Sequence, residues 1–204
     1  MGCSGSVNRV RGLLGSLNCD AGFGLALLAA CALLLSLTAA GHSGALLLRY
    51  DRAGLAEGQV WRLLTAHLVH LGVRHALLNC LGLVLLWALF ARDYTPRQWL
   101  PIVLGAMAAI DAGLWWFDST VLWYVGSSGV LHGVMAAGAL AHLRRREPDG
   151  WLLGAFLLAK LTWEQWMGAL PLSGSDPVVV QAHLYGVVGG LAMASIRRPA
   201  AKPL

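Results

Sequence analysis

Long apolar runs separated by short polar loops constrain this chain more than any other feature of its sequence. The first run, residues 21–40, contains no charged side chain. Five more runs follow, at about 74–91, 99–117, 126–143, 151–167 and 178–196. A helix needs about 20 mostly apolar residues to cross a bilayer. We therefore predict an all-α membrane protein, a bundle of six transmembrane helices.

The low charge content excludes several other classes of protein. Only 12% of the 204 residues are charged and 57% are hydrophobic. A soluble domain of ordinary composition carries about twice that share of charge. Disordered chains, nucleic-acid-binding domains and most cytosolic enzymes are therefore excluded.

The positions of the basic residues predict which way the helices run. Ten of the 15 lysines and arginines precede the first run, follow the sixth, or lie in the loops after the second and fourth. The loops 118–125 and 168–177 contain none. Because cytoplasmic loops carry the excess of Lys and Arg, we expect both termini in the cytoplasm. This gives a cytoplasmic segment at 1–20, a membrane domain at 21–196 and a cytoplasmic tail at 197–204.

Polar side chains inside the spans are the candidates for function, because such groups are costly in a bilayer. The string GSSG at 126–129 opens the fourth span. The same Gly-x-Ser-Gly spacing occurs at 2–5 and 41–44, but there it lies outside the spans. At a helix N-terminus, the Ser128 hydroxyl and the backbone N–H groups are suited to nucleophilic chemistry and to holding an oxyanion. The alternative is a serine that only caps an ordinary helix.

His183, near the start of the sixth span, is the candidate general base. The fourth and sixth spans run in the same direction, so Ser128 and His183 lie at similar depth. Each span also carries two glycines four residues apart: Gly129 and Gly133, and Gly186 and Gly190. Such pairs let two helices approach closely, which would bring the hydroxyl to the imidazole. The alternatives are that His183 bonds only to a neighbouring helix, or that His132, one turn after Ser128, is the base.

The start of the second span offers hydrogen-bond donors. His75 and Asn79 are one helical turn apart and share a face, which suits the stabilisation of an oxyanion. His67 and His70 precede them, and we interpret both as structural. A zinc site is the rival interpretation of these histidines, but no carboxylate accompanies them. We predict no metal ion and no other cofactor.

Three charged residues also lie in the interior of spans. Lys160 and Glu164 are spaced to neutralise each other, and we interpret them as a structural pair. Asp111 in the third span is a candidate to orient a histidine, which would complete a catalytic triad. Nothing in the sequence brings it to His183, so we predict a Ser–His dyad.

In their order along the chain, these motifs resemble those of the rhomboid intramembrane serine proteases. The resemblance covers about 57–190, and its motifs are Gln59-Val60-Trp61-Arg62, His70, His75, Asn79, GSSG at 126–129 and Ala182-His183-x-x-Gly186. It implies that Ser128 is the nucleophile and His183 the base. It also implies that His75, Asn79 and the Ser128 backbone N–H form the oxyanion hole.

One departure from the rhomboid pattern is informative. His132 stands where typical rhomboids carry an aromatic residue, usually Tyr, against the base. The string GSSGVLHG at 126–133 is similar to the rhombosortase subgroup, which is linked to bacterial secreted proteins ending in Gly-Gly, an apolar span and a basic tail. This resemblance implies removal of that tail near the outer leaflet, with hydrolysis or transfer of the new C-terminus to a membrane amine. His132 is then either an alternative base or a residue that packs beside the site.

The resemblance also implies a location and partners. We expect a multi-pass protein of the bacterial inner membrane whose active site faces the periplasm. Its partners would be the lipid bilayer and the transmembrane segment of a secreted or surface protein, and not nucleic acid. One alternative is a non-catalytic rhomboid-like protein that binds client transmembrane helices, although such relatives usually lack the Ser or the His. A small transporter is the other, although the sequence has no internal repeat.

Overall fold

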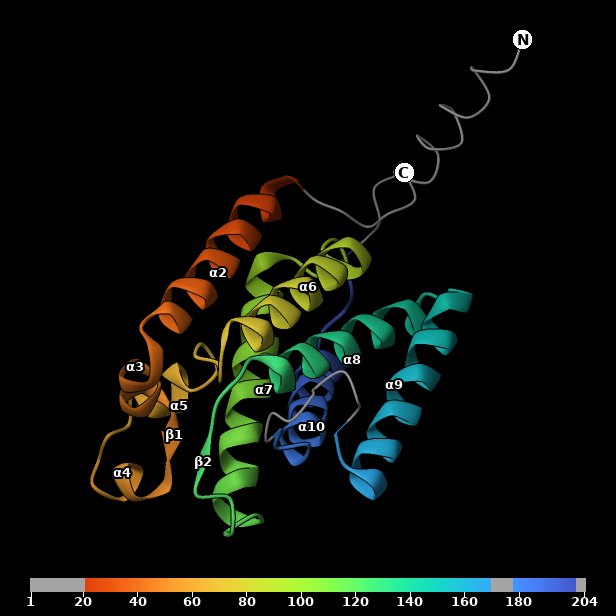
Figure 1. Cartoon of the computed structure of the whole chain (residues 1–204). Helices are drawn as coiled ribbons and strands as arrows, with labels where there is room; N and C mark the ends of the chain where they lie inside the picture. Colours follow the sequence, from red (N-terminus) through yellow and green to blue (C-terminus); the bar gives the residue numbers. More distant parts are fainter. Residues whose placement is uncertain (1–20, 170–177, 201–204) are drawn as a thin grey trace.

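The protein is described by a computed structural model at residues 21–169 and 178–200 (Figure 1). The expected cytoplasmic segment at 1–20 and residues 201–204 of the expected tail lie outside the described residues. The elements are α2 (Ala21–Ala39), α3 (Gly41–Leu48), β1 (Tyr50–Asp51), α4 (Arg52–Ala56), α5 (Arg62–Thr65), α6 (Val73–Phe90), α7 (Pro96–Trp116), β2 (Trp123–Tyr124), α8 (Ser128–Arg144), α9 (Pro148–Met167) and α10 (Gln181–Ser195).

The structure is mostly helical, as predicted, and each apolar run contains one long helix. By length and composition α6 and α7 are able to cross a membrane, and the bent pair α2–α3 would add a third span among the described residues. Helices α8 and α10 have 17 and 15 residues. At about 1.5 Å per residue they are shorter than a bilayer core of about 30 Å. Six crossings therefore stay a prediction.

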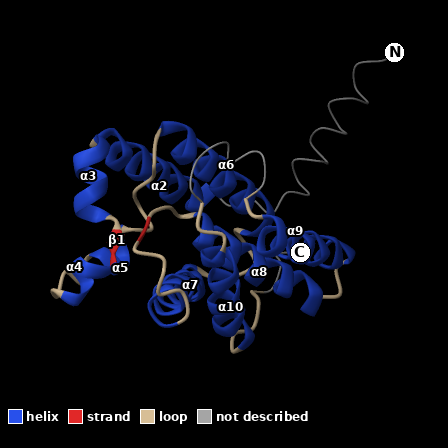
Figure 2. Cartoon of the chain, turned by 60° about the horizontal axis from the view of Figure 1, so that its bottom comes forward, coloured by secondary structure: helices blue, strands red, loops and turns tan. Residues whose placement is uncertain are grey.

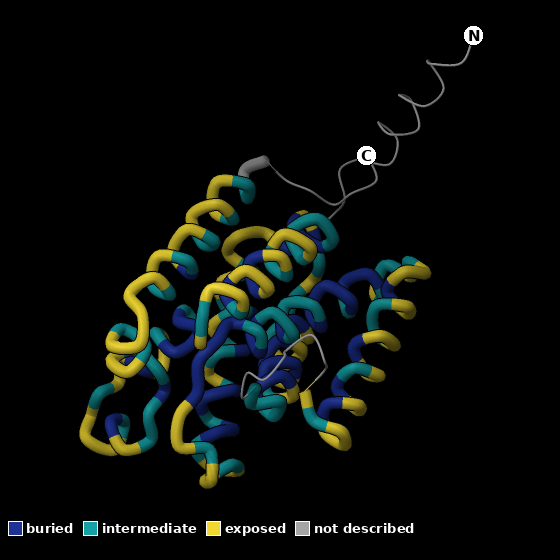
Figure 3. The backbone as a smooth tube through the Cα atoms, viewed as in Figure 1, coloured by how far each residue is buried: buried dark blue, intermediate teal, exposed yellow. Residues whose placement is uncertain are grey.

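Large apolar side chains cover the outer faces of the helices. Figure 3 shows exposed residues along the outer sides of α2 and α9, whereas much of α8 and α10 is buried. The exposed set includes Leu25, Leu28, Leu77, Leu81, Trp151, Phe156, Trp163 and Trp166. A water-soluble protein rarely exposes so many large apolar groups, and a lipid environment accounts for them.

Helix α10 packs closely against α8 and α7 at the centre of the bundle (Figures 1 and 2). A Cβ atom on Gly186 would collide with the carbonyl oxygen of Gly129, and one on Gly190 with that of Gly133. The close approach predicted from these two glycine pairs is thus confirmed. On the α7 side, Gly189 meets the Gly105 carbonyl in the same way. Backbones at this distance fix the relative position of the first turns of α8 and α10.

The connector between α3 and α6 fixes the chain just before α8. Strand β1 pairs antiparallel with β2, with Tyr50 opposite Tyr124, which the all-α prediction did not include. The Gly126 amide donates to the Ala66 carbonyl at 2.9 Å, and the Tyr124 hydroxyl donates to the Gly126 carbonyl at 2.5 Å. The segment that enters α8 is therefore held from both sides.

Arg62 organises the connector from inside it. Its buried guanidinium donates to the carbonyls of Leu46 and Arg49 at 2.9 and 2.8 Å, and to the Gln59 side chain at 2.7 Å. Asp51 caps α4 by accepting from the Gly54 amide. Although burial opposes ionisation, this amide and Arg49 keep the pKa of Asp51 below its usual value.

Candidate active site

Ser128 is the first residue of α8, and its hydroxyl faces a histidine of α10. The distance from Ser128 Oγ to His183 Nε2 is 3.0 Å, which is within hydrogen-bonding range. His183 is 4% exposed, whereas Ser128 is partly accessible. The Gly129–Gly186 contact lies directly beside this pair and sets the spacing of the two helices. A hydroxyl held against a buried imidazole is the arrangement of an activated nucleophile.

The other side of the His183 ring contacts a carboxylate on α9. His183 Nδ1 lies 2.8 Å from Glu164 Oε2, and Glu164 is 3% exposed. Because an ionised carboxylate only accepts, Nδ1 carries the hydrogen and Nε2 is left to accept the Ser128 proton. Glu164 Oε1 also accepts from Lys160 Nζ at 2.5 Å. The predicted Lys160–Glu164 pair is therefore present, but Glu164 has a second partner that sequence reasoning missed.

A sequence signal for this contact did exist. The fifth span runs opposite to the fourth and sixth, so its C-terminal end reaches the depth at which those two spans begin. Glu164 lies three residues before the end of α9 at Met167. An acidic residue at that depth is a candidate partner for a histidine near the start of the sixth span.

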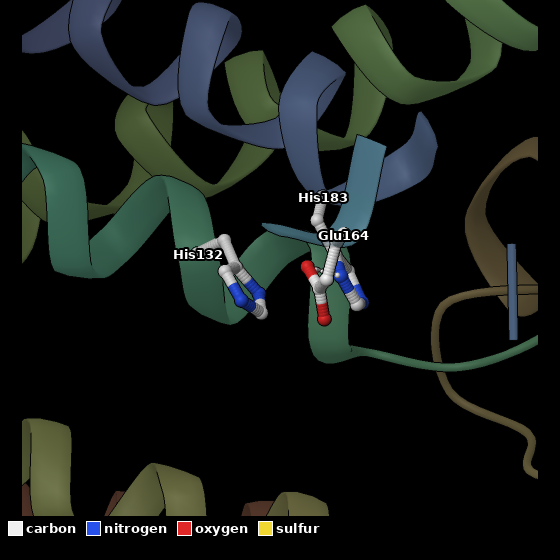
Figure 4. A group of neighbouring side chains, drawn as sticks. All are labelled: His132, Glu164 and His183. Carbon is white, nitrogen blue, oxygen red and sulfur yellow. Dashed lines mark hydrogen bonds and ion pairs between the residues drawn. The ribbon is translucent and has the colours of Figure 1, made fainter. Parts of the chain in front are cut away.

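His132 stacks on the ring of His183, the candidate base, and does not contact the Ser128 hydroxyl. The His132 and His183 rings lie 4.1 Å apart, centroid to centroid, with 14° between their planes. His132 Nδ1 donates to the backbone carbonyl of Ser128 at 2.7 Å. Figure 4 shows His132 on one side of His183 and Glu164 immediately beside it. Of the two histidines, the structure brings His183 to the Ser128 hydroxyl.

His75 and Asn79 of α6 face the same pocket as Ser128 and His183. Asn79 Nδ2 donates to the His75 carbonyl at 2.9 Å, and Asn79 Oδ1 accepts from Ser127 Oγ at 3.1 Å. The second hydrogen of the Asn79 amide group has the chemistry needed to donate to an oxyanion. A Cβ atom on Gly126 would lie 3.1 Å from the His75 ring, so a glycine lets this ring approach the start of α8.

His70, in the connector, contacts Ser127, the residue that donates to Asn79. Its Nε2 lies 3.2 Å from Ser127 Oγ. Burial and the neighbouring His75 lower the pKa of His70 to about 3, so the ring is neutral near pH 7. A neutral ring beside Ser127 Oγ fits the structural interpretation of His70.

Asp111 and His67 lie together in a different place. His67 Nε2 is 3.4 Å from Asp111 Oδ1, and the His67 ring packs edge-on against Tyr124. Asp111 therefore faces His67, and the carboxylate at His183 comes from Glu164.

The pocket that contains these groups is long and mostly apolar. Its volume is about 520 Å³, and it lies between α6 and α9 with α8 behind it. Its apolar lining includes Leu78, Leu81, Leu85, Leu131, Leu153 and Phe156. The polar groups, Ser128 and His183 among them, are thus reached from an apolar groove.

Three residues of the site are also close enough together to bind a metal ion. His132, Glu164 and His183 each offer a ligand atom, all within 4.8 Å of one another. Both ring nitrogens of His183, however, have hydrogen-bond partners in Ser128 and Glu164. A metal at this position would have to displace one of them.

Comparison with known proteins gives a consistent result. The family model described as Rhomboid domain matches residues 57–200, a range that includes every residue lining the pocket. The chain is also 27% identical over 137 residues to "Putative rhomboid protease YdcA" of Bacillus subtilis (strain 168), an alignment that covers 67% of each protein.

Proposed function

The chain belongs to the rhomboid family, and from this premise we propose that it is an intramembrane serine protease with Ser128 as nucleophile and His183 as general base. The single observation that carries the proposal is the 3.0 Å distance between Ser128 Oγ and His183 Nε2. The geometry fits the requirement that a base accept the proton of the attacking hydroxyl.

The reaction proceeds in two steps. His183 Nε2 accepts the Ser128 proton as Oγ attacks the scissile carbonyl, and the Ser128 N–H, His75 and Asn79 donate to the resulting oxyanion. His183 then gives its proton to the leaving amine, which leaves an acyl-enzyme on Ser128. Water, or an amine in the membrane, attacks this ester and releases the new C-terminus.

The substrate is a membrane-anchored protein whose transmembrane segment enters from the side. The apolar groove between α6 and α9 supports this route, because its lining is mostly apolar and includes Ser128. An apolar segment gains little by leaving lipid for such a groove. Binding there therefore depends on how well the segment fits and on how readily it unwinds near the cleavage point.

The membrane arrangement belongs to the same proposal. Six helices cross the bacterial inner membrane, both termini lie in the cytoplasm, and residues 21–196 form the membrane domain. The active site then opens toward the periplasm. The absence of Lys and Arg from the loops 118–125 and 168–177 supports this orientation.

The substrate class is that of the rhombosortase subgroup. We infer that the enzyme removes a C-terminal tail made of Gly-Gly, an apolar span and basic residues. The support is the string GSSGVLHG at 126–133 together with the stacking of His132 on His183. After cleavage the mature C-terminus is released by water or transferred to a membrane amine.

The test is cleavage of a reporter protein that carries such a tail, in proteoliposomes containing the enzyme. Wild type should shorten the reporter and Ser128→Ala should not, while the variant still inserts and folds. Ser43→Ala is the matched control, because Ser43 occupies the same place in the Gly-x-Ser-Gly string at 41–44 and is exposed on α3. Mass spectrometry of the new C-terminus distinguishes hydrolysis from transfer.

Two results would reject the proposal. Cleavage by Ser128→Ala at the wild-type rate would rule out the assigned nucleophile. If wild type binds the tail but leaves it intact, the chain is a non-catalytic binder of client helices.

A further inference from the structure

We propose that Glu164 is a positioning residue that turns the Ser128–His183 pair into a Ser–His–Glu triad, with Lys160 holding the carboxylate in place. This inference rests on the proposed function and deepens it. The predicted dyad assigns no role to any carboxylate. The structure brings one to within 2.8 Å of the imidazole nitrogen that faces away from Ser128.

The first argument is the hydrogen-bond pattern of the His183 ring. Nδ1 donates to Glu164 Oε2, so the hydrogen of the neutral ring is fixed on Nδ1. Nε2 then has a free lone pair pointing at Ser128 Oγ. Without the carboxylate, the hydrogen can move to Nε2, and that tautomer cannot accept the serine proton.

The second argument is geometric. Stacking on His132 fixes the plane of the His183 ring, but it leaves the ring able to turn within that plane. The bond to Glu164 removes this freedom, because it fixes the direction of Nδ1 and hence of Nε2. The two contacts come from different helices, α8 and α9, and act on different motions of the same ring.

The third argument is electrostatic. When Ser128 attacks, its proton moves to Nε2 and the ring becomes an imidazolium, while the Nδ1 proton stays where it is. Glu164 remains a carboxylate and gains a positive neighbour at hydrogen-bonding distance. Both groups are buried, so their attraction is weakly screened and favours the transition state over the resting state.

Lys160 explains how an ionised glutamate is held in this apolar helix. Its ammonium donates to Oε1, the oxygen that His183 does not use. Each carboxylate oxygen thus has one partner, and the i,i+4 spacing on α9 presents both residues to the same groove.

The competing explanation is that Glu164 serves only to neutralise Lys160 within the membrane. The two explanations differ in what happens when both charges are removed together. If Glu164 only balances Lys160, the double variant Lys160→Met/Glu164→Gln has no uncompensated charge and should work. If Glu164 positions His183, the double variant should be as impaired as Glu164→Gln.

The experiment measures kcat and KM for the tailed reporter with wild type, Glu164→Gln, Lys160→Met and the double variant. We expect kcat of Glu164→Gln to fall by about 10- to 100-fold, with KM changed by less than about threefold, because general-base catalysis is impaired and substrate binding is not. The double variant should show the same fall in kcat. Lys160→Met should keep more activity than either, since it leaves the Glu164–His183 bond intact.

Two results would overturn this inference. One is a double variant that recovers wild-type kcat, and the other is a Glu164→Gln variant with wild-type kcat. Thermal unfolding of each purified variant shows whether it is folded, so that a loss of activity is not confused with a loss of structure. If Glu164→Gln fails to fold, the kcat of the charge-balanced double variant decides whether Glu164 positions His183. Failure of the proposed function looks different, since wild type itself would then be inactive or Ser128→Ala would stay active.

Discussion

The ring of His132 lies parallel to that of His183 at 4.1 Å, while its Nδ1 donates to the Ser128 carbonyl at 2.7 Å. His132 therefore provides a flat surface and one backbone hydrogen bond, and neither contact accepts the serine proton. If this is the aromatic position of the rhomboid pattern, as the resemblance implies, histidine keeps a ring there.

We predict that His132→Phe keeps cleavage within about tenfold of wild type, because a phenyl ring restores the stacking surface. His183→Phe should lose about 10²- to 10⁴-fold, the usual contribution of a general base. Initial cleavage rates in proteoliposomes measure both. If His132→Phe loses activity while His183→Phe keeps it, His132 is the base and the two roles must be exchanged.

The contact between Gly186 and the Gly129 carbonyl predicts a stability effect. Gly186→Ala forces a Cβ atom against that carbonyl and should destabilise the fold by about 1–3 kcal/mol, as overpacking does. Gly154→Ala is the matched control, because a Cβ atom on Gly154 of α9 meets nothing within 4 Å. Thermal unfolding in detergent should show a lower midpoint only for the first variant. Equal midpoints would mean that the α8–α10 contact tolerates a methyl group.

Asn79 should matter for the rate of cleavage more than for binding. Asn79→Asp keeps the shape and the acceptor that faces Ser127, but the ionised side chain cannot donate to an oxyanion. We expect kcat to fall by about 10²- to 10³-fold, the typical cost of losing one oxyanion donor. Ser127→Ala removes only the neighbouring hydroxyl and should cost far less. A fall confined to KM would place Asn79 in substrate binding.

Chelation tests the alternative use of His132, Glu164 and His183 as metal ligands. We predict that EDTA treatment leaves the cleavage rate unchanged, since both ring nitrogens of His183 have partners in Ser128 and Glu164. Added zinc ions should inhibit reversibly by competing for the same three side chains. Loss of activity with EDTA and its recovery with zinc would instead make this a metalloenzyme.

The sequence predicted the parts of the fold that depend on local pattern. Apolar run length located α6 and α7 to within a few residues, and the spacing of Gly129 and Gly133 indicated a close helix contact. The bend after the first run was missed. There Gly41 adopts φ of +67°, and α3 continues at 109° to α2. A glycine just after an apolar run does not reveal which of its permitted conformations it takes.

Contacts between distant segments were harder to predict. Tyr50 pairs with Tyr124 through strands of only two residues each, too short to give an alternating pattern. The i,i+4 rule found the Lys160–Glu164 pair because both residues lie on one helix. The Glu164–His183 bond depends on how α9 is rotated about its own axis, and the sequence of that helix alone does not specify this rotation.

Helix α9 contributes to two features of the candidate site. It forms one wall of the apolar groove, and it carries the carboxylate that holds the base. If α9 moved outward to admit a helix, Glu164 would move away from His183 with it. Under the proposed function, the site would then be least reactive while a candidate helix passes the entrance and most reactive once α9 has returned. Substrate access and reactivity would then depend on the position of the same helix. Helices that pass the entrance only briefly would escape cleavage.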